Sequence, residues 1–230
     1  MDYLKRAIFD KFRQKLIPNK VLLLLGPRRI GKTIFIRQVL EKLDEPYLLL
    51  NGEDVTTSDM LKKRSVENYK RMLGTKKVLV IDEAQKVPDI GKILKLMVDE
   101  IKGVKIIVTG SSTFDLTNKL GEPLTGRKIT FNLYPLGQME LAKTENAIQT
   151  RANLDERLIY GSYPELLQYQ SNEEKTEYLR EIVNSYLLKD ILAFDNIRNS
   201  SKLLDLLRML AFQVGKEVSY HELGNQLSLG

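Results

Sequence analysis

The sequence contains no cysteine and a single histidine, His221. Without thiols the chain can form no disulfide, no thiolate metal site and no thiol nucleophile, and one imidazole cannot build a histidine metal cluster. Apolar runs are short, and none approaches the roughly 18 residues that a membrane-spanning helix needs. The first 15 residues interleave charged and apolar side chains, unlike a secretory signal peptide. These absences predict a cytoplasmic protein with no membrane segment.

The composition is otherwise ordinary for a globular protein. Of 230 residues, 43% are hydrophobic and 29% are charged, which suffices for one large domain or two small ones. The net charge of +6 would suit contact with nucleic acid, but the basic residues fall in separate short groups. Examples are Lys62-Lys63-Arg64, Lys70-Arg71 and Lys76-Lys77. We expect most of these groups to be solvated faces, because mixed surface charge is the usual basis of solubility.

Apolar runs recur at intervals that indicate alternating strands and helices. Candidate strands cover residues 21–25, 47–50, 77–81, 104–109 and 128–133, with helix-length segments between them. Apolar residues repeat with a helical period of about 3.6 in residues 3–17, 34–43 and 90–101. This alternation predicts an α/β fold in which a five-stranded parallel sheet is covered by helices on both faces.

The strand signals stop near residue 137. Residues 138–194 have helical patterns that are interrupted at Gly161-Ser162-Tyr163-Pro164 and near Ser171-Asn172, and we expect a helical lid there. From residue 200 a helix, a glycine turn and a second helix resemble the start of a winged helix or helix-turn-helix. The predicted organisation is a core over residues 1–137, a lid over 138–197 and a partial winged-helix region over 198–230.

The first candidate strand leads into the octapeptide Gly26-Pro27-Arg28-Arg29-Ile30-Gly31-Lys32-Thr33, and a helical pattern begins around Ile34. A G-x-x-x-x-G-K-T sequence between a strand and a helix predicts a phosphate-binding loop with contacts up to Ile34. Its glycines permit a tight turn that aims backbone N–H groups at phosphate oxygens near the helix N-terminus. Lys32 would reach the β- and γ-phosphates, and the Thr33 hydroxyl would bind Mg²⁺. Arg28 and Arg29 could contact phosphate, contact a partner or face water.

Two adjacent carboxylates, Asp82 and Glu83, follow the apolar run at residues 77–81. Asp82 would enter the Mg²⁺ shell, and Glu83 would act as general base for an attacking water. Alternatively, the pair only ends a strand and caps the next helix. The phosphate-binding loop and the matching α/β pattern favour the catalytic interpretation.

Two further candidates lie later in the chain. The run at residues 104–109 ends in Thr109-Gly110-Ser111-Ser112, where a small hydroxyl could position the lytic water or touch the γ-phosphate. We favour Ser111 for this sensing role, although a simple glycine turn with a helix cap explains the same residues. Arg127 would reach the γ-phosphate of a neighbouring subunit in a homo-oligomer, or it would only form an ion pair at a strand start.

Seven segments together resemble one protein family. They are GPRRIGKT, VLVIDEAQ, IIVTGSST, LTGR, YPL, GSYPEL and YLLKDIL, and they span nearly the whole chain. The sequence resembles the prokaryotic AAA-type P-loop ATPases with the AAA_14 plus DUF4143 architecture, which are relatives of AAA+ proteins. The resemblance implies that Lys32 binds phosphate, that the Thr33 hydroxyl and the Asp82 carboxylate bind magnesium, and that Glu83 is the catalytic glutamate. It also implies that Ser111 is a sensor and that Arg127 is an arginine finger.

The sequence departs from that family in two respects. Many AAA+ lids present a second sensor arginine, but the comparable residues 161–167 contain none. The role is therefore absent, or Arg157 or Arg180 fills it. Family members also continue well past this length, so the chain resembles a member truncated at its C-terminus.

The expected function is hydrolysis of ATP with Mg²⁺, coupled through lid movement to a C-terminal region that binds DNA or a protein partner. A GTPase would need Asn-Lys-x-Asp, whereas Asn118-Lys119 continues with Leu120-Gly121. A small-molecule kinase shares the phosphate-binding loop, but Glu83 favours water as the phosphoryl acceptor. An alternative of a different class is a nucleotide-gated switch or interaction module that binds ATP and turns it over slowly.

Overall fold

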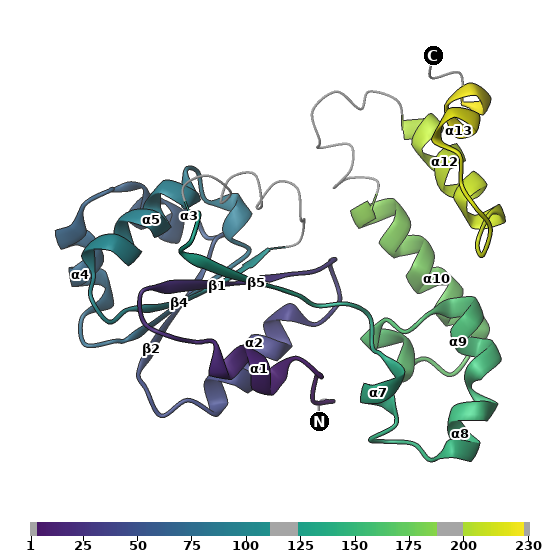
Figure 1. Cartoon of the computed structure of the whole chain (residues 1–230), viewed down its shortest axis with the longest axis horizontal. Helices are drawn as coiled ribbons and strands as arrows, with labels where there is room; N and C mark the ends of the chain where they lie inside the picture. Colours follow the sequence, from purple (N-terminus) through teal and green to yellow (C-terminus); the bar gives the residue numbers. More distant parts are fainter. Residues whose placement is uncertain (1–3, 111–123, 188–199, 228–230) are drawn as a thin grey trace. The chain divides into compact units, whose positions relative to one another are not determined.

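The computed structural model describes residues 4–110, 124–187 and 200–227 (Figure 1). It divides into two compact units, Met1–Gln170 and Ser171–Gly230, which are described separately below. Ser111 lies outside the described residues, so its predicted sensing role stays a prediction. The proposed boundaries at residues 137 and 197 stay predictions as well.

The first unit is built on a five-stranded parallel sheet, which confirms the predicted fold class. The strands are β1 (Lys20–Leu25), β2 (Tyr47–Asn51), β3 (Val78–Asp82), β4 (Lys105–Gly110) and β5 (Lys128–Asn132). Their order across the sheet is β2-β3-β4-β1-β5, and every neighbouring pair is parallel. The carboxyl ends of all five strands therefore lie along one edge, where ligands bind in open α/β sheets.

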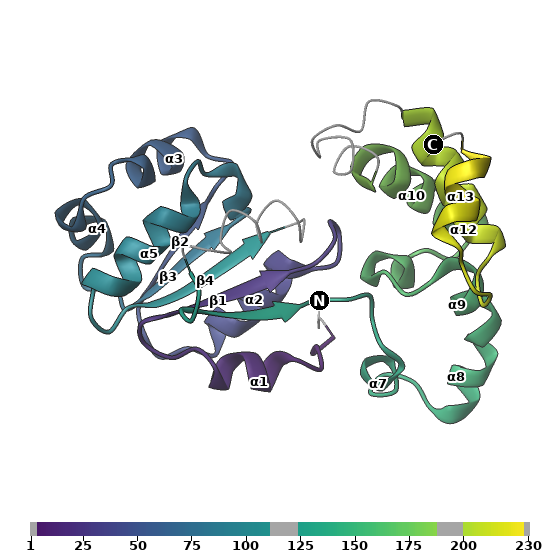
Figure 2. The ribbon, with the colours of Figure 1, turned by 45° about the horizontal axis from the view of Figure 1, so that its top comes forward.

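Helices cover both faces of this sheet, as Figures 1 and 2 show. One face carries α1 (Phe9–Gln14) and α2 (Lys32–Glu41), and the other carries α3 (Val55–Lys62), α4 (Val66–Leu73) and α5 (Ile90–Glu100). The side chains of β1 divide accordingly, with Leu22 and Leu24 in one apolar cluster and Val21 and Leu23 in the other. This division follows from the period of two along a strand.

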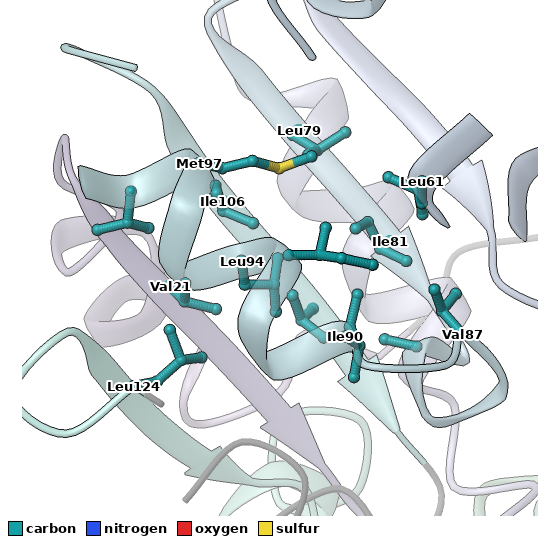
Figure 3. Packing of buried hydrophobic residues seen from close by; sticks show 14 of the residues in the cluster. Val21, Leu61, Leu79, Ile81, Val87, Ile90, Leu94, Met97, Ile106 and Leu124 are labelled. Carbon is teal, nitrogen blue, oxygen red and sulfur yellow. The ribbon is translucent and has the colours of Figure 1, made fainter. Parts of the chain in front are cut away.

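Figure 3 shows the cluster under α5, where Ile90, Leu94 and Met97 pack on Leu79 and Ile106 of the sheet. All five side chains are fully buried. The opposite cluster is more aromatic: the ring of Phe12 meets those of Phe35 and Phe131 edge to face at centroid distances of 5.1 and 5.0 Å. The two clusters hold the sheet between its helical layers, and they thereby fix the positions of the carboxyl strand ends that carry the candidate site.

The N-terminal helix is shorter than its sequence pattern predicts. Apolar periodicity indicates a helix over residues 3–17, but α1 covers only Phe9–Gln14. The backbone N–H of Ala7 donates to the Glu140 carboxylate at 2.6 Å instead of entering a helical ladder, and Arg6 is held by the same carboxylate. A long-range polar contact therefore replaces the first part of the expected helix.

After β5 the first unit continues with α7 (Gln138–Leu141), α8 (Ala147–Ala152), α9 (Leu154–Tyr160) and the 3-10 helix η2 (Pro164–Gln168). The predicted interruption at residues 161–164 is confirmed, and Gly161 has a φ of +77° there. Such a left-handed backbone favours glycine after a helix.

The second unit contains α10 (Asn172–Ile182), the π-helix η3 (Val183–Leu187), α12 (Ser200–Phe212) and α13 (Tyr220–Gln226). Ser171 caps α10 by accepting from the N–H of Glu174, as the predicted break near Ser171-Asn172 requires. The winged helix stays a prediction, although the helix and glycine turn expected after residue 200 are present. None of the described helices is long and apolar enough to cross a membrane.

Candidate functional site

The loop between β1 and α2 has the backbone conformation that its glycines predict. Gly31 has a φ of +91°, which L-residues with a side chain rarely adopt. At Gly26 an added Cβ would lie 2.5 Å from the carbonyl oxygen of Leu133, so the close approach of two backbones requires a glycine. Arg29 is also left-handed, with a φ of +62°. Turns of this kind form concave sites for anions at a helix N-terminus.

Lys32 begins α2 and is 5% exposed. Its ammonium donates to the carbonyl oxygens of Gly26 at 2.9 Å and Pro27 at 3.0 Å. The lysine side chain therefore folds back over the loop that immediately precedes α2. A buried ammonium at a helix N-terminus attracts phosphate oxygens, because both the charge and the helix dipole favour an anion there.

Thr33 and Asp82 are brought together although they are 49 positions apart. The Thr33 hydroxyl donates to Asp82 Oδ2 at 2.9 Å, beside Lys32 at the start of α2. Hydroxyl and carboxylate oxygens are the hard ligands that Mg²⁺ prefers. Among the described residues, no cluster of three or more His, Cys, Asp or Glu side chains could hold a metal ion alone. The two ligands therefore fit an ion that also takes oxygens from water and phosphate.

Thr109 was not singled out by the sequence, yet it connects the two candidate acidic residues. It is fully buried at the end of β4, its hydroxyl donates to Asp82 Oδ1, and it accepts from the backbone N–H of Glu83 at 3.1 Å. The sequence indicated a hydroxyl in this segment but favoured Ser111. The signal that points to Thr109 is a hydroxyl placed directly after the apolar run Ile106-Ile107-Val108, where a buried polar group needs a hydrogen-bond partner.

Glu83 lies directly after β3 with a φ of +51°. This left-handed backbone is uncommon outside glycine, and such residues gather at functional sites. Its carboxylate accepts from the side-chain amide of Gln85. Gly52 supports the same turn: its N–H donates to the carbonyl oxygen of Asp82 at 2.7 Å, and an added Cβ would lie 2.5 Å from the carbonyl oxygen of Glu83. The sequence gave no indication of Gly52.

A pocket of about 440 Å³ adjoins the phosphate-binding loop within the first unit. Its lining includes Arg29, Gly31 and Ile34 from the loop and the start of α2, together with Leu136 and four residues of η2, which are Pro164, Glu165, Leu167 and Gln168. Arg29 Nη1 lies 3.4 Å from Glu165 Oε2, so an ion pair joins the loop to η2. The pocket is mainly apolar with a few polar groups, as small-molecule sites usually are.

Arg6 and Glu140 form a buried ion pair beside this pocket, with Nε and Oε1 3.0 Å apart. Arg6 also donates to the carbonyl oxygens of Ile30, at 3.1 Å, and Tyr134. Burial raises the pKa of Glu140, but hydrogen bonds from the N–H groups of Ala7 and Gly137 and the contact with Arg6 hold the pKa below its usual value. This network fastens the chain before α1 to the loop and to α7.

Arg28 belongs to the loop itself, whereas the candidates Arg127 and Arg157 form ion pairs elsewhere in the first unit. Arg127 lies at the amino edge of the sheet, where its carbonyl accepts from Val21 and its Nε lies 2.6 Å from Asp99 Oδ1. The loop lies at the other end of β1, about 15 Å along the strand. Arg157 is paired with Glu145 at 2.5 Å. Arg180 belongs to the second unit and Arg28 is half-buried in the loop.

Comparisons with known proteins agree with this geometry. Residues 18–142 match the family described as AAA domain (AAA_14). Residues 151–230 match a domain of unknown function, DUF8612, where the resemblance had indicated DUF4143.

An uncharacterised protein of Methanocaldococcus jannaschii is 29% identical over 93% of this chain and 51% of its own length. An uncharacterised protein of Mycobacterium tuberculosis is 25% identical over 98% of this chain and 48% of its own length. The chain thus spans about half the length of these relatives. The fold is similar to that of the Walker-type ATPase PABY2304 of Pyrococcus abyssi, with a TM-score of 0.62 and 17% identity over 99% of this chain and 89% of that one. The AAA domain family matches residues 18–142, which are more than half of this chain, so the chain belongs to that family.

Proposed function

We propose that this protein binds ATP with Mg²⁺ and hydrolyses it. The observation that carries the proposal is the contact between Thr33 Oγ1 and Asp82 Oδ2 beside a buried Lys32. A cation, a hydroxyl and a carboxylate in this arrangement would receive a metal-bound triphosphate. The similarity of this chain's fold to that of the Walker-type ATPase PABY2304 of Pyrococcus abyssi supports the same proposal.

Each predicted loop residue has a role in this proposal. Lys32 would exchange its bonds to Gly26 and Pro27 for bonds to phosphate oxygens, and the backbone N–H groups of residues 29–34 would contact the remaining oxygens. Bound Mg²⁺ would supply positive charge that stabilises the departing phosphate oxygens. Thr33 and Asp82 would hold the ion, and the mainly apolar pocket beside Gly31 and Ile34 would receive the base.

Glu83 would act as the general base. Its carboxylate would take a proton from water while the water oxygen bonds to the γ-phosphorus, and the bond between that phosphorus and the bridging oxygen would break to release the diphosphate. Thr109 would orient this step by fixing both the Asp82 carboxylate and the Glu83 backbone. Arg127 would serve a neighbouring subunit, since it lies away from the loop of its own chain.

The parts after residue 137 would use the nucleotide state. We propose that residues 138–197 act as a lid, and that residues 198–230 pass its movement to a protein or DNA partner. Two described contacts would let loop and lid communicate: the ion pair between Arg29 and Glu165, and Arg6, which binds both Ile30 and Glu140.

Phosphate release by the Glu83→Gln variant tests the proposal. This change keeps the size of the side chain but removes the base, so ATP affinity should persist while phosphate release falls by about 100-fold or more. Glu53→Gln is a matched control, because Glu53 is exposed, and it should leave release unchanged. Normal release from Glu83→Gln would remove Glu83 from the mechanism.

One observation favours the second candidate, a nucleotide-gated switch with little turnover. The Glu83 carboxylate is already engaged by Gln85, and Arg29 is engaged by Glu165. A triphosphate that attracts Arg29 would release Glu165 without any bond being broken. In that case the Glu165→Gln variant would alter ATP affinity, and the Glu83→Gln variant would leave the slow phosphate release unchanged.

A further inference from the structure

A second hollow, of about 630 Å³, lies at the opposite edge of the sheet from the phosphate-binding loop. Lys77 and Lys105, at the starts of β3 and β4, line it, whereas Asp82 and Gly110 lie at the carboxyl ends of the same strands. The turn after α4 and the turn after α5 complete its walls. No part of the site described above reaches this hollow.

The hollow concentrates positive charge. Five lysines and one glutamate line it, and no arginine is among the lining residues. The glutamate, Glu45, is paired with Lys105 at 2.7 Å. The other four lysines are exposed, and none of them forms an ion pair with another described residue; they are Lys70, Lys76, Lys77 and Lys102. The sequence predicted that most basic groups are solvated faces, and these lysines are indeed exposed; the fold also brings Lys70, Lys76 and Lys77, from two of those groups, to one concavity.

The lysines extend into a row along the amino edge of the sheet. Lys20 begins β1, Lys105 begins β4 and Lys128 begins β5, while Lys77 immediately precedes β3. Lys20 is in register with Lys105, and Lys128 is in register with Val21. The N–H of Lys105 donates to the carbonyl oxygen of Lys77 at 3.0 Å, which places these two side by side. Lys105 is also in register with Val78, so Lys77 and Lys128 each lie one position out of register with Lys105 and Lys20, and the cations of this edge are shared between the two faces of the sheet.

We propose that this hollow, lined by Lys70, Lys76, Lys77, Lys102 and Lys105, binds the phosphate backbone of a nucleic acid. Several exposed cations gathered around one concavity suit a polymer that presents several anionic phosphates at once. Lysine presents a compact charge on a flexible stem, which fits phosphates without reading base sequence. A concave surface of one charge sign also concentrates anions from solution. The proposal does not depend on ATP hydrolysis, because it uses none of the residues of the first site.

Anisotropy of a fluorescein-labelled oligonucleotide, single-stranded or as a duplex, measures this binding in the whole chain. We expect the Lys76→Gln, Lys77→Gln, Lys102→Gln triple variant to weaken binding by about tenfold or more at low salt. The slope of the logarithm of affinity against the logarithm of salt concentration should become smaller in magnitude by about two to three, one for each lost phosphate contact.

The matched control is the Lys11→Gln, Lys15→Gln, Lys143→Gln triple variant, which removes the same charge from exposed positions of the first unit. It should change affinity by no more than about twofold. Thermal unfolding of both variants reports whether each remains folded, and Lys102→Glu alone should weaken binding if the triple variant is unstable.

Three outcomes would overturn the proposal. Equal losses in the two triple variants would assign the binding to net charge alone. Equal competition by polyglutamate at the same charge concentration would assign the hollow to an acidic protein. Loss of oligonucleotide binding in Lys32→Ala would show that the oligonucleotide binds at the phosphate-binding loop and not in the hollow. Normal oligonucleotide binding together with absent ATP binding would contradict the proposed function and leave this inference standing.

Discussion

At the scale of single residues, Thr109 holds the candidate site together. Its one hydroxyl donates to the Asp82 carboxylate and accepts from the N–H of Glu83. Asp82, the proposed metal ligand, and Glu83, the proposed base, therefore share one buried support. A change at Thr109 should disturb both without altering any group that would touch the nucleotide.

We predict that Thr109→Val lowers phosphate release and destabilises the fold. Valine keeps the branched shape but leaves the Glu83 N–H without its acceptor, at a cost of about 1–3 kcal/mol. Phosphate release and urea unfolding of the same preparation provide the two readouts. Thr109→Ser keeps the hydroxyl and should retain most of the release. If valine matches the wild type in both, the hydroxyl has no positioning role.

The sequence predicts some residues of the site and misses others for a physical reason. Lys32, Thr33 and Asp82 follow from local patterns in which a strand, a turn and a helix are contiguous. Thr109 and Gly52 acquire their contacts only because β4 and β2 both lie beside β3. Strand order is a property of tertiary packing, which spacing along the chain does not encode.

At the scale of elements, the Arg6–Glu140 pair fastens three segments to one another. Both side chains are less than a tenth exposed, and their bonds reach the chain before α1, the phosphate-binding loop and the start of α7. Because the pair is buried, loss of one partner leaves an uncompensated charge, whereas loss of both does not.

We therefore predict that Arg6→Met lowers the free energy of unfolding by about 3–5 kcal/mol. The double variant Arg6→Met, Glu140→Leu should recover a large part of that loss, because no buried charge remains unpaired. Urea denaturation of the wild type, both single variants and the double variant gives the coupling energy. Additive losses would show that the two side chains act independently.

A second ion pair predicts a dependence on pH. Arg157 donates to Glu145 at 2.7 and 2.5 Å. This contact, together with hydrogen bonds from Gln138, Thr150 and Asn153, outweighs the effect of burial and lowers the pKa of Glu145 from 4.5 to about 2. A carboxylate with a lowered pKa stabilises the folded state above its unfolded pKa, and this contribution disappears as pH falls toward the folded value.

The melting temperatures of the wild type and of Glu145→Gln should therefore differ most above about pH 5 and converge near pH 2. Thermal melts across this range provide the measurement, and Asp155→Asn, an exposed neighbour, serves as the control. A difference that stays constant with pH would show that the pair contributes nothing through its charge.

The sequence predicts most elements but not their ends. All five strands and the cores of α2 and α5 follow from apolar periodicity, because the buried face of each element repeats along the chain. The N-terminal helix is too long in the prediction, since Glu140, more than a hundred positions away, takes the Ala7 N–H. A local pattern cannot anticipate a distant acceptor.

At the scale of the whole molecule, the two proposed functions belong to opposite edges of the parallel sheet of the first unit. The carboxyl edge carries the phosphate-binding loop, Asp82 and Thr109, and the amino edge carries the lysine hollow. The relatives are about twice as long as this chain, so their remaining regions add parts that lie outside the sequence described. The nucleotide binding proposed for the carboxyl edge can be tested directly in this chain.

Titration calorimetry with ATP and Mg²⁺ is the most direct test of the central claim. The wild type should release heat with one nucleotide bound per chain, and Lys32→Ala should bind at least about tenfold more weakly, because hydrogen bonds to charged groups contribute about 1.5–3 kcal/mol. Thr33→Ala should remove the dependence of affinity on Mg²⁺. Equal affinity in the wild type and Lys32→Ala, or no heat from the folded wild type, would contradict the account.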